Sequence, residues 1–318
     1  MQNISFLTQI FLSILIGIGA LSHIVKPTFA QSASLTITPP VTEILLSPNK
    51  KLVHSFTVHN QGETLKLSAN LHKIMPTDSW GHTMVDPTPL DESSIPLIIG
   101  IENADIKLGE PFTVNSGQSQ QIVLSITAAN VDLPVDTYLG LVFQQFVDNP
   151  PDSPQIPGIT ALILVTLTPD GALPLSLEIA DFDLPAVHDS AQILTFTPKI
   201  KNASSIMVRP AGVLEVVSPK GKLVHSQELF PHLVLGNSER TLTARAKDSS
   251  IPLSWQASKL ALGPYKIRLK VMSPGGTKLE EVERVVWILP IRAIIITALL
   301  SITILIALIR FRSHKLYY

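Results

Sequence analysis

The chain has 318 residues, with 24 Lys and Arg against 25 Asp and Glu, and it contains no Cys. A net charge of -1 gives none of the basic excess that nucleic-acid binders show, so we expect no nucleic-acid partner. The absence of Cys excludes disulfides, Cys-ligated zinc, iron–sulfur clusters and thiol nucleophiles. The length is sufficient for two domains of about 150 residues, each with its own core.

The N-terminal end carries a targeting segment. Residues 4–21 form an apolar run, and Thr28 and Ala30 lie three and one residues before Gln31. This pattern predicts a signal peptide over 1–30 with cleavage after Ala30. No Lys or Arg precedes the apolar run, which leaves an uncleaved N-terminal anchor as the alternative. In both cases the chain that follows is exported.

The C-terminal end predicts a transmembrane helix over 291–309. Ala293–Ile309 is a charge-free stretch of 17 residues, enough to cross about 30 Å of hydrocarbon when Ile291 and Arg292 extend it. Trp287 precedes it, and the tail 310–318 is basic. Positive charge favours the cytoplasmic side, so we expect a single-pass type I protein of the cell membrane with an extracytoplasmic ectodomain. No matching LPxTG sortase motif precedes the helix, so the helix is expected to remain.

The region 31–175 reads as short strands. In residues 51–60, His54, Phe56 and Val58 share one face while Ser55, Thr57 and His59 share the other, which is the period of two that β-strands show. The turn at 60–62 then reverses the chain. The further strands expected in this region are 34–38, 65–71, 112–116, 120–128, 137–146 and 159–168.

The region 176–290 repeats the same landmarks in the same order. FTVHNQGE in the first half corresponds to FTPKIKNASS in the second, and LPVDTYLGLVF corresponds to LALGPYKIRLKV. A Tyr at such a strand start often anchors a sandwich corner through its hydroxyl, which gives Tyr138 and Tyr265 structural roles. The sequence therefore predicts an all-β protein of two immunoglobulin-like antiparallel β-sandwiches in tandem, domain 1 over 31–175 and domain 2 over 176–290, with the boundary near 169–174.

Charge is divided unevenly between the two halves. Residues 31–175 hold 14 acidic residues against five Lys and no Arg, a net -9, whereas 176–290 hold 14 basic against 11 acidic residues, a net +3. Solubility explains an acidic domain 1. The alternative is that it avoids anionic wall polymers, or binds cations or a basic partner, while a basic domain 2 tolerates an anionic lipid surface.

Catalytic motifs are missing from the sequence. It contains no GxSxG, HExxH or GxxxxGK[ST], and its one glycine-rich Gly-x-Gly lies inside the predicted signal peptide. His54 and His59 fall on opposite faces of one strand, and His72 and His82 could approach each other, but no Asp or Glu has a supporting spacing that distinguishes them from chance. We therefore expect no catalytic residues, no metal site and no cofactor.

Two long loops carry the candidate binding residues. Met75–Glu92 is polar and contains Asp78, Trp80 and His82, and a Trp in such a loop either offers a stacking platform or folds back as a lid. The second loop, 148–158, is stiffened by Pro and contributes Pro150, Pro151 and Asp152. Asn202 begins a match to the N-glycosylation sequon, which matters only in a eukaryotic secretory pathway.

The order of these parts resembles the bacterial WxL-interacting surface proteins. The resemblance consists of a signal sequence, FTVHNQGE, QQIVLSITA followed by LPVDTYLGLVF, a second sandwich and a membrane helix with a basic tail. It covers about 31–315 through short motifs and implies peptidoglycan association for the first domain and protein or host binding for the second. No functional residue of that family is carried over.

The first half is also similar to periplasmic pilus chaperones, whose opening TPxxxxL matches TPPVTEILLSP. Those chaperones hold a client carboxylate with basic residues between their domains, whereas 31–175 contains no Arg and no Lys before Lys50.

The leading hypothesis is a non-enzymatic, membrane-anchored bacterial surface protein that binds cell-wall peptidoglycan or a surface protein through loops and exposed strand edges. The alternative is an extracytoplasmic chaperone or assembly factor for surface subunits. A wall-modifying enzyme is the third class considered.

Overall fold

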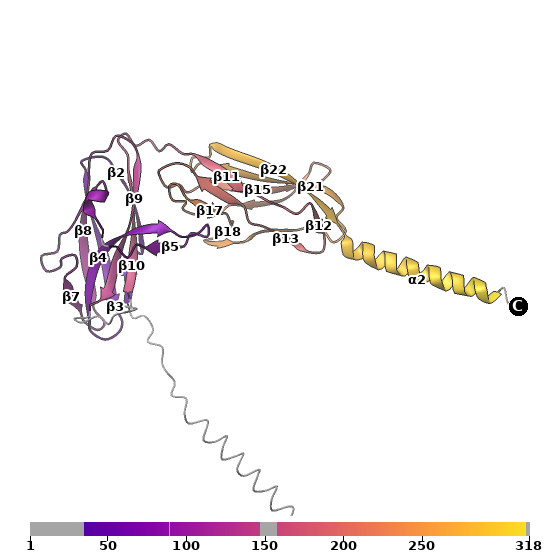
Figure 1. The fold of residues 1–318 in the computed structure, drawn as a ribbon, viewed down its shortest axis with the longest axis horizontal. Helices are drawn as coiled ribbons and strands as arrows, with labels where there is room; N and C mark the ends of the chain where they lie inside the picture. Colours follow the sequence, from indigo (N-terminus) through magenta and orange to yellow (C-terminus); the bar gives the residue numbers. More distant parts are fainter. Residues whose placement is uncertain (1–34, 89, 147–157, 316–318) are drawn as a thin grey trace, which may run out of the picture.

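The structure is a computed structural model that describes residues 35–88, 90–146 and 158–315. The predicted signal peptide lies outside these residues. The described chain is built from strands, one short 3-10 turn and one long helix (Figure 1), which confirms the expected all-β class. Two separate clusters of buried apolar side chains divide the strands into a first unit, β1–β10, and a second unit, β11–β22.

The first unit consists of two facing sheets with the orders β1-β3-β8-β6 and β2-β10-β9-β4-β5, and β7 pairs with β4. Alternation along each strand buries one face, as Phe56 and Val58 in β3 show, with no exposed surface. The bounds are β1 Leu35–Thr38, β2 Val41–Leu46, β3 Lys51–Asn60, β4 Leu65–Pro76, β5 Thr83–Val85, β6 Leu97–Ile101, β7 Pro111–Val114, β8 Ser119–Ala128, β9 Val135–Gln145 and β10 Gly158–Leu167, with the 3-10 turn η1 at Glu92–Ser94.

The second unit has a five-stranded sheet, β12-β22-β21-β15-β16, which faces the smaller sheets β11-β14-β17, β13-β20 and β18-β19. Its strands are β11 Leu177–Asp181, β12 Val187–Asp189, β13 Ile193–Phe196, β14 Lys199–Asn202, β15 Ala211–Val217, β16 Leu223–Glu228, β17 Glu239–Thr241, β18 Ala244–Ala246, β19 Ser249–Ile251, β20 Leu253–Gln256, β21 Gly263–Met272 and β22 Lys278–Leu289.

The two landmark segments take the same local structure in both units. Asn60 and Asn202 are fully buried at the ends of β3 and β14, and each Nδ2 donates to backbone carbonyls of the loops around it. Each Oδ1 accepts the N–H two residues later, at Gly62 and Ser204. The Asn202 side chain is therefore committed to the fold, and its buried amide is not a place for a glycan.

Three segments differ from the sequence-based expectation. Met75–Glu92 is not one open loop, because β4 continues to Pro76 and pairs with β5 to form a projecting hairpin. The run QILTFTPKIKN at 192–202, whose alternation predicts one strand, is two strands, β13 and β14, since Pro198 cannot donate to a ladder. Short strands such as β2, β6, β12 and β20 were not foreseen.

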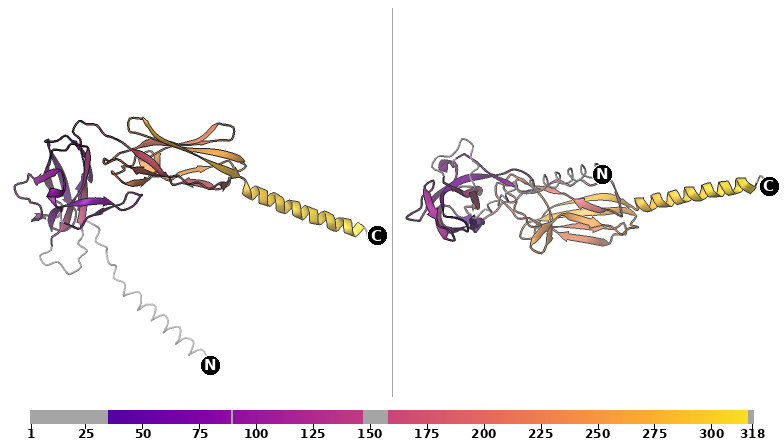
Figure 2. Two further views of the ribbon diagram at one scale, coloured as in Figure 1. Left: turned by 45° about the horizontal axis from the view of Figure 1, so that its top comes forward. Right: turned by 90° about the horizontal axis from the view of Figure 1, so that it is seen from below.

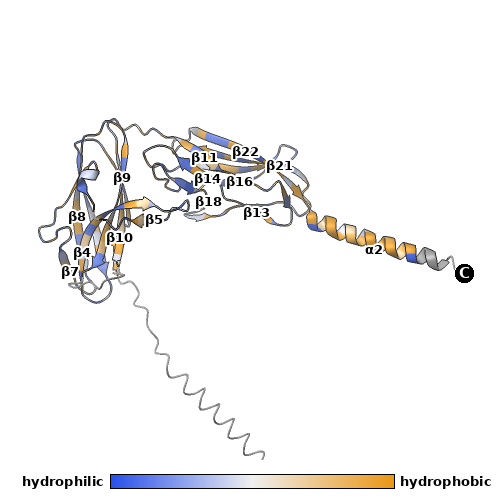
Figure 3. Cartoon of the chain, in the orientation of Figure 1, coloured by the Kyte–Doolittle hydropathy of each residue, from blue (hydrophilic) through white to orange (hydrophobic). Residues whose placement is uncertain are grey.

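Helix α2 spans Ile291–Lys315 directly after β22. Its segment Ile291–Arg310 has 20 residues and a mean hydropathy of 2.5, and none of it is buried against the rest of the chain. Figure 3 shows hydrophobic residues along most of its length, and the helix extends from the far end of the second unit. By length and composition this helix is able to span a membrane.

Candidate functional site

The two units meet at an elbow, where the first unit lies across one end of the second (Figures 1 and 2). The outer face of the sheet β2-β10-β9-β4-β5 lies toward the second unit.

Asp78 organises the tip of the β4–β5 hairpin. Its Oδ1 accepts hydrogen bonds from the backbone N–H of Trp80 (2.9 Å) and His82 (3.1 Å), and its Oδ2 lies 2.6 Å from Nδ1 of His82. The hydrogen bond from the His82 side chain is the main reason that the pKa of Asp78 is below its usual value. Asp78 and His82 thus satisfy each other, and Trp80 remains 57% exposed.

The same hairpin tip contacts the second unit. The backbone N–H of Thr241 donates to the carbonyl of Ser79 (2.6 Å), and the two hydroxyl groups lie 3.2 Å apart. Gly81 has φ +87°, and its missing Cβ leaves the space that the Arg240 guanidinium occupies. The loop that the sequence marks as a ligand-binding segment therefore holds the two units together through Ser79 and Gly81.

The second predicted set lies elsewhere in the chain. Pro150, Pro151 and Asp152 fall outside the described residues. The structure therefore brings together Asp78, Trp80 and His82 alone.

Asp136 is the centre of the joint between the units. Its Oδ1 accepts from the Thr166 hydroxyl (2.6 Å), and its Oδ2 accepts from the Tyr138 hydroxyl (2.6 Å) and from the backbone N–H of Met207 (2.5 Å). The Tyr138 oxygen in turn accepts from the backbone N–H of Gly236 (2.8 Å). Tyr138 has the structural role expected of it, but it anchors the neighbouring unit as well as its own strand.

Burial is the main influence on the pKa values of Asp136 and Tyr138. It raises the pKa of Asp136, and the donors Thr166, Tyr138 and Met207 oppose the rise. Burial and the adjacent carboxyl group both raise the pKa of Tyr138, which keeps its hydroxyl protonated and able to donate. The joint is a set of matched hydrogen bonds rather than a reactive centre.

Basic side chains of the second unit line the elbow. Arg209 forms an ion pair with Glu43 and donates to the carbonyl of Pro231 (3.2 Å). The Arg240 guanidinium lies 3.2 Å from Nδ1 of His232, whose Nε2 lies 2.7 Å from the Thr243 hydroxyl. Burial lowers the pKa of His232, and Arg240 and Arg209 lower it further, so the neutral ring accepts at Nδ1 and donates at Nε2.

Two cavities lie between the units. One, of about 130 Å³, lies under the hairpin between Ile74, Leu162 and Arg240. The other, of about 270 Å³, lies between β2 and the second unit, and its lining includes Glu43, Leu45, Leu173, Leu175, Met207 and Arg209. Arg209 and Arg240 of the second unit thus lie against the acidic first unit at the elbow.

Strand β2 is an edge strand beside the larger cavity. It pairs in parallel with β10, and Leu162 N donates to Pro40 O while Thr168 N donates to Leu46 O. Backbone groups alternate sides along a strand, so those of Val41, Glu43 and Leu45 face away from β10. Within the described residues no strand pairs with this side of β2.

The side chains along that edge are exposed. Val41 is 44% exposed and Leu45 is 59% exposed, whereas Ile44 and Leu46 are buried in the core. Edge strands with unpaired N–H and C=O groups accept an added strand. The edge, its apolar side chains and the cavity with Arg209 together form what we call the elbow site.

The sequence contained one sign of the elbow site that the motif search missed. The alternation in VTEILL over 41–46 marks a strand, and the preceding Pro39 and Pro40 separate it from β1. β1 and β2 therefore belong to opposite sheets. Which residues of the second unit face β2 depends on the docking of the units, which no local pattern reveals.

Among the described residues, no group of three or more His, Asp or Glu side chains is arranged to hold a metal ion. His72 bonds through Nδ1 to the Asp86 carbonyl (2.9 Å) rather than to His82.

Comparison with known proteins gives distant structural likeness only. No family model and no curated protein matches the chain. A chain from the chaperone–tip adhesin complex of CFA/I fimbriae is 10% identical, with a TM-score of 0.39 over 80% of this chain and 99% of that chain. A chain from the CsuC–CsuE chaperone–tip subunit complex of Acinetobacter baumannii is 12% identical, with a TM-score of 0.35 over 81% and 99%. A chain from the SafA pilin–SafB chaperone complex of Salmonella enterica is 13% identical, with a TM-score of 0.35 over 80% and 98%.

Proposed function

We propose that this chain is a non-enzymatic, membrane-anchored assembly factor that holds an extended segment of another exported protein at the elbow site. The observation that carries the proposal is the edge of β2 that pairs with no strand among the described residues, whose outward backbone groups lie beside a cavity between the two units. This is the chaperone interpretation of the opening TPPVTEILLSP, with helix α2 as the anchor and its basic end in the cytoplasm.

Strand addition explains how such a site would bind many sequences. Main-chain hydrogen bonds to Val41, Glu43 and Leu45 supply affinity without regard to sequence, and alternate side chains of the guest would contact the apolar patch and the cavity. Arg209 offers a donor for a guest carboxylate once its pairing with Glu43 is exchanged.

A cross-linking experiment tests the proposal. A photo-reactive amino acid is placed at Leu45 in the full-length protein, which is expressed in its own cells. We expect it to cross-link to residues on one face of an extended segment of the bound protein. Sequencing of the cross-linked peptide should identify that segment. In a second variant, the photo-reactive amino acid is placed at Val41 and Leu45 is replaced by proline. Leu45→Pro should abolish the cross-link from Val41, since proline removes an N–H that points away from β10 and leaves the hydrogen bonds to β10 intact. The matched control is a reporter at Ile98, which is 66% exposed on the edge strand of the opposite sheet.

Equal cross-linking from Leu45 and Ile98 would contradict strand capture at β2. So would a partner whose yield is unchanged by Leu45→Pro in a variant that keeps its melting temperature.

The polymer-binding hypothesis stays a separate prediction that rests on Trp80. Its side chain is 57% exposed, while Asp78 and His82 are engaged with each other. If the ring stacks on a sugar, Trp80→Ala should release the protein from isolated peptidoglycan sacculi in a cosedimentation assay at two salt concentrations. Pelleting that is unaffected by Trp80→Ala would exclude this residue as the polymer contact.

A further inference from the structure

Three connections form the end of the second unit from which α2 departs: the connection after β12, the β15–β16 turn and the connection before β21. Gly263 pairs with Ile288, and the N–H of Ser190 donates to the carbonyl of Leu289, so the connections before β21 and after β12 lie level with the end of β22. Helix α2 begins at Ile291, two residues beyond that level. Figures 1 and 2 show the helix leaving this end in every view.

Exposed leucines gather in the connection before β21. The turn Ser258–Ala261 is closed by a hydrogen bond from Ala261 N to Ser258 O (2.8 Å), which places Lys259 and Leu260 at its tip. Leu260 is 76% exposed and Leu262 is 64% exposed. Neither side chain belongs to the core of the second unit. Leu260 lies at the tip of the turn and Leu262 follows the turn directly, and exposed apolar side chains that cluster are typical of a contact surface.

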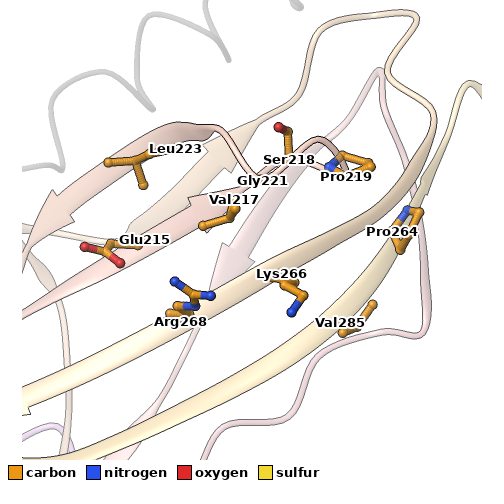
Figure 4. Close-up of a pocket in the computed structure, with 10 residues that line it drawn as sticks. All are labelled: Glu215, Val217, Ser218, Pro219, Gly221, Leu223, Pro264, Lys266, Arg268 and Val285. Carbon is orange, nitrogen blue, oxygen red and sulfur yellow. The ribbon is translucent and has the colours of Figure 1, made fainter.

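Positive charge accompanies these leucines. The β15–β16 turn, residues 218–222, has the sequence SPKGK, with Lys220 and Lys222 and no acidic residue. Pro219 contacts the backbone of Gly263, and Figure 4 shows Pro219 and Pro264 at the same end of the sheet, so this turn lies beside the leucine turn. Lys259 adds a third amino group.

The neighbouring acidic and aromatic groups fit the same picture. Asp189, at the end of β12, is almost buried and pairs with Arg292 of the helix (3.2 Å), so its charge is matched within the chain. Trp287 is half-exposed on β22, four residues before the helix. Aromatic side chains at this distance from a membrane helix favour the headgroup layer.

We propose that Leu260, Leu262, Lys259, Lys220 and Lys222, which we call the proximal rim, form a membrane-contact surface that inserts into the headgroup layer of an anionic bilayer. The proposal rests on the anchoring of α2 proposed above. Leucine side chains at the acyl boundary and lysine amino groups at lipid phosphates are the combination by which surface segments bind a bilayer. The contact would fix the second unit on the membrane and hold the elbow site at a set height above it.

Site-specific fluorescence on the full-length protein tests the proximal rim. Because the chain has no Cys, Leu260→Cys gives a single site for an environment-sensitive label. After reconstitution in vesicles of phosphatidylcholine and phosphatidylglycerol, we expect a blue shift of the label and its protection from aqueous iodide. The same label at Ile98→Cys, in the first unit, should show neither change.

Two further variants separate the proposal from the anchoring on which it rests. A label at Ile302→Cys reports whether α2 is in the hydrocarbon. If that label is shielded while the label at Leu260→Cys is quenched as strongly as that at Ile98→Cys, the rim proposal is overturned and the anchor stands. If the label at Ile302→Cys is itself quenched, the anchor and the rim proposal both fail.

The charge contribution is tested with Lys220→Glu, Lys222→Glu and Lys259→Glu combined in the Leu260→Cys background. We expect the blue shift in anionic vesicles to fall to its value in phosphatidylcholine alone. An unchanged shift in the anionic vesicles would contradict recognition of anionic headgroups.

Discussion

At the level of single residues, Asp136 joins the units because its carboxylate accepts from donors on both of them. Thr166 and Tyr138 belong to the first unit, and the Met207 N–H belongs to the second. The three donors offset part of the cost of burying the Asp136 carboxylate, and removal of this acceptor leaves the donors unpaired.

We therefore expect Asp136→Ala to lower the free energy of unfolding by about 1–3 kcal/mol, the usual cost of leaving buried donors without an acceptor. Urea unfolding followed by circular dichroism measures it. Asp132→Ala, an exposed position on the preceding loop, is the control and should change little. Equal stability of the two variants would show that the joint contributes nothing to folding.

His232 gives the elbow a dependence on pH. Burial, Arg240 and Arg209 lower its pKa in the folded protein, so the unfolded chain binds the proton more readily. Stability is then lost as the pH falls below the ordinary value of about 6.5 toward the lower folded pKa.

Unfolding by urea at about pH 7.5 and about pH 5.5 should reveal this loss. His232→Gln, which keeps an acceptor for Arg240 and a donor for Thr243, should reduce the difference between the two values. A variant with the full pH dependence of the native protein would assign the effect to other groups.

At the level of elements, the β4–β5 hairpin holds the two units together through contacts at its tip. Sequence reasoning identified this segment as special from its length and its Trp, and placed the importance in ligand binding. The structure shows a further role, in which Ser79 and Gly81 contact Thr241 and Arg240, and ligand binding by Trp80 stays a prediction. A local pattern could reveal a long polar segment, but the partner across the elbow is about 160 residues away in sequence.

Gly81→Ala should weaken the contact between the tip of the β4–β5 hairpin and the second unit. A Cβ at φ +87° is strained by about 1–2 kcal/mol and would also displace the Arg240 guanidinium. Gly117→Ala is the matched control, because Gly117 has φ +70° and nothing within 4 Å of the added Cβ. Calorimetry should show a larger fall in melting temperature for Gly81→Ala; a fall equal to that of Gly117→Ala would leave the strain alone as the cause.

At the level of the whole molecule, the two units and the helix follow one another as three bodies along the chain. The first unit reaches the second through the elbow, whereas α2 is not buried against either. The helix therefore contributes little packing to the two units, and its exposed side chains interact with whatever surrounds the helix.

A chain that stops after Pro290 should keep its fold and leave the membrane. Since Arg292 of α2 forms an ion pair with Asp189 (3.2 Å) and the helix is not buried against the rest of the chain, we expect a melting temperature within a few degrees of that of the full protein. Ultracentrifugation of cell extracts should move the truncated chain to the soluble fraction. Its recovery with the membranes would show that the ectodomain binds them without the helix.

The sequence by itself determined the all-β class, most of the long strands, the two corresponding segments FTVHNQGE and FTPKIKNASS, and the apolar C-terminal helix. These features depend on periodicity, turn residues and hydropathy, which are local. The tertiary structure alone decided that Asp136 and Tyr138 face Met207 and Gly236, that the Asp78 hairpin braces Arg240, and that β2 is left with a free edge. Those outcomes depend on how two separately built sheets dock, and docking brings together residues that share no sequence neighbourhood.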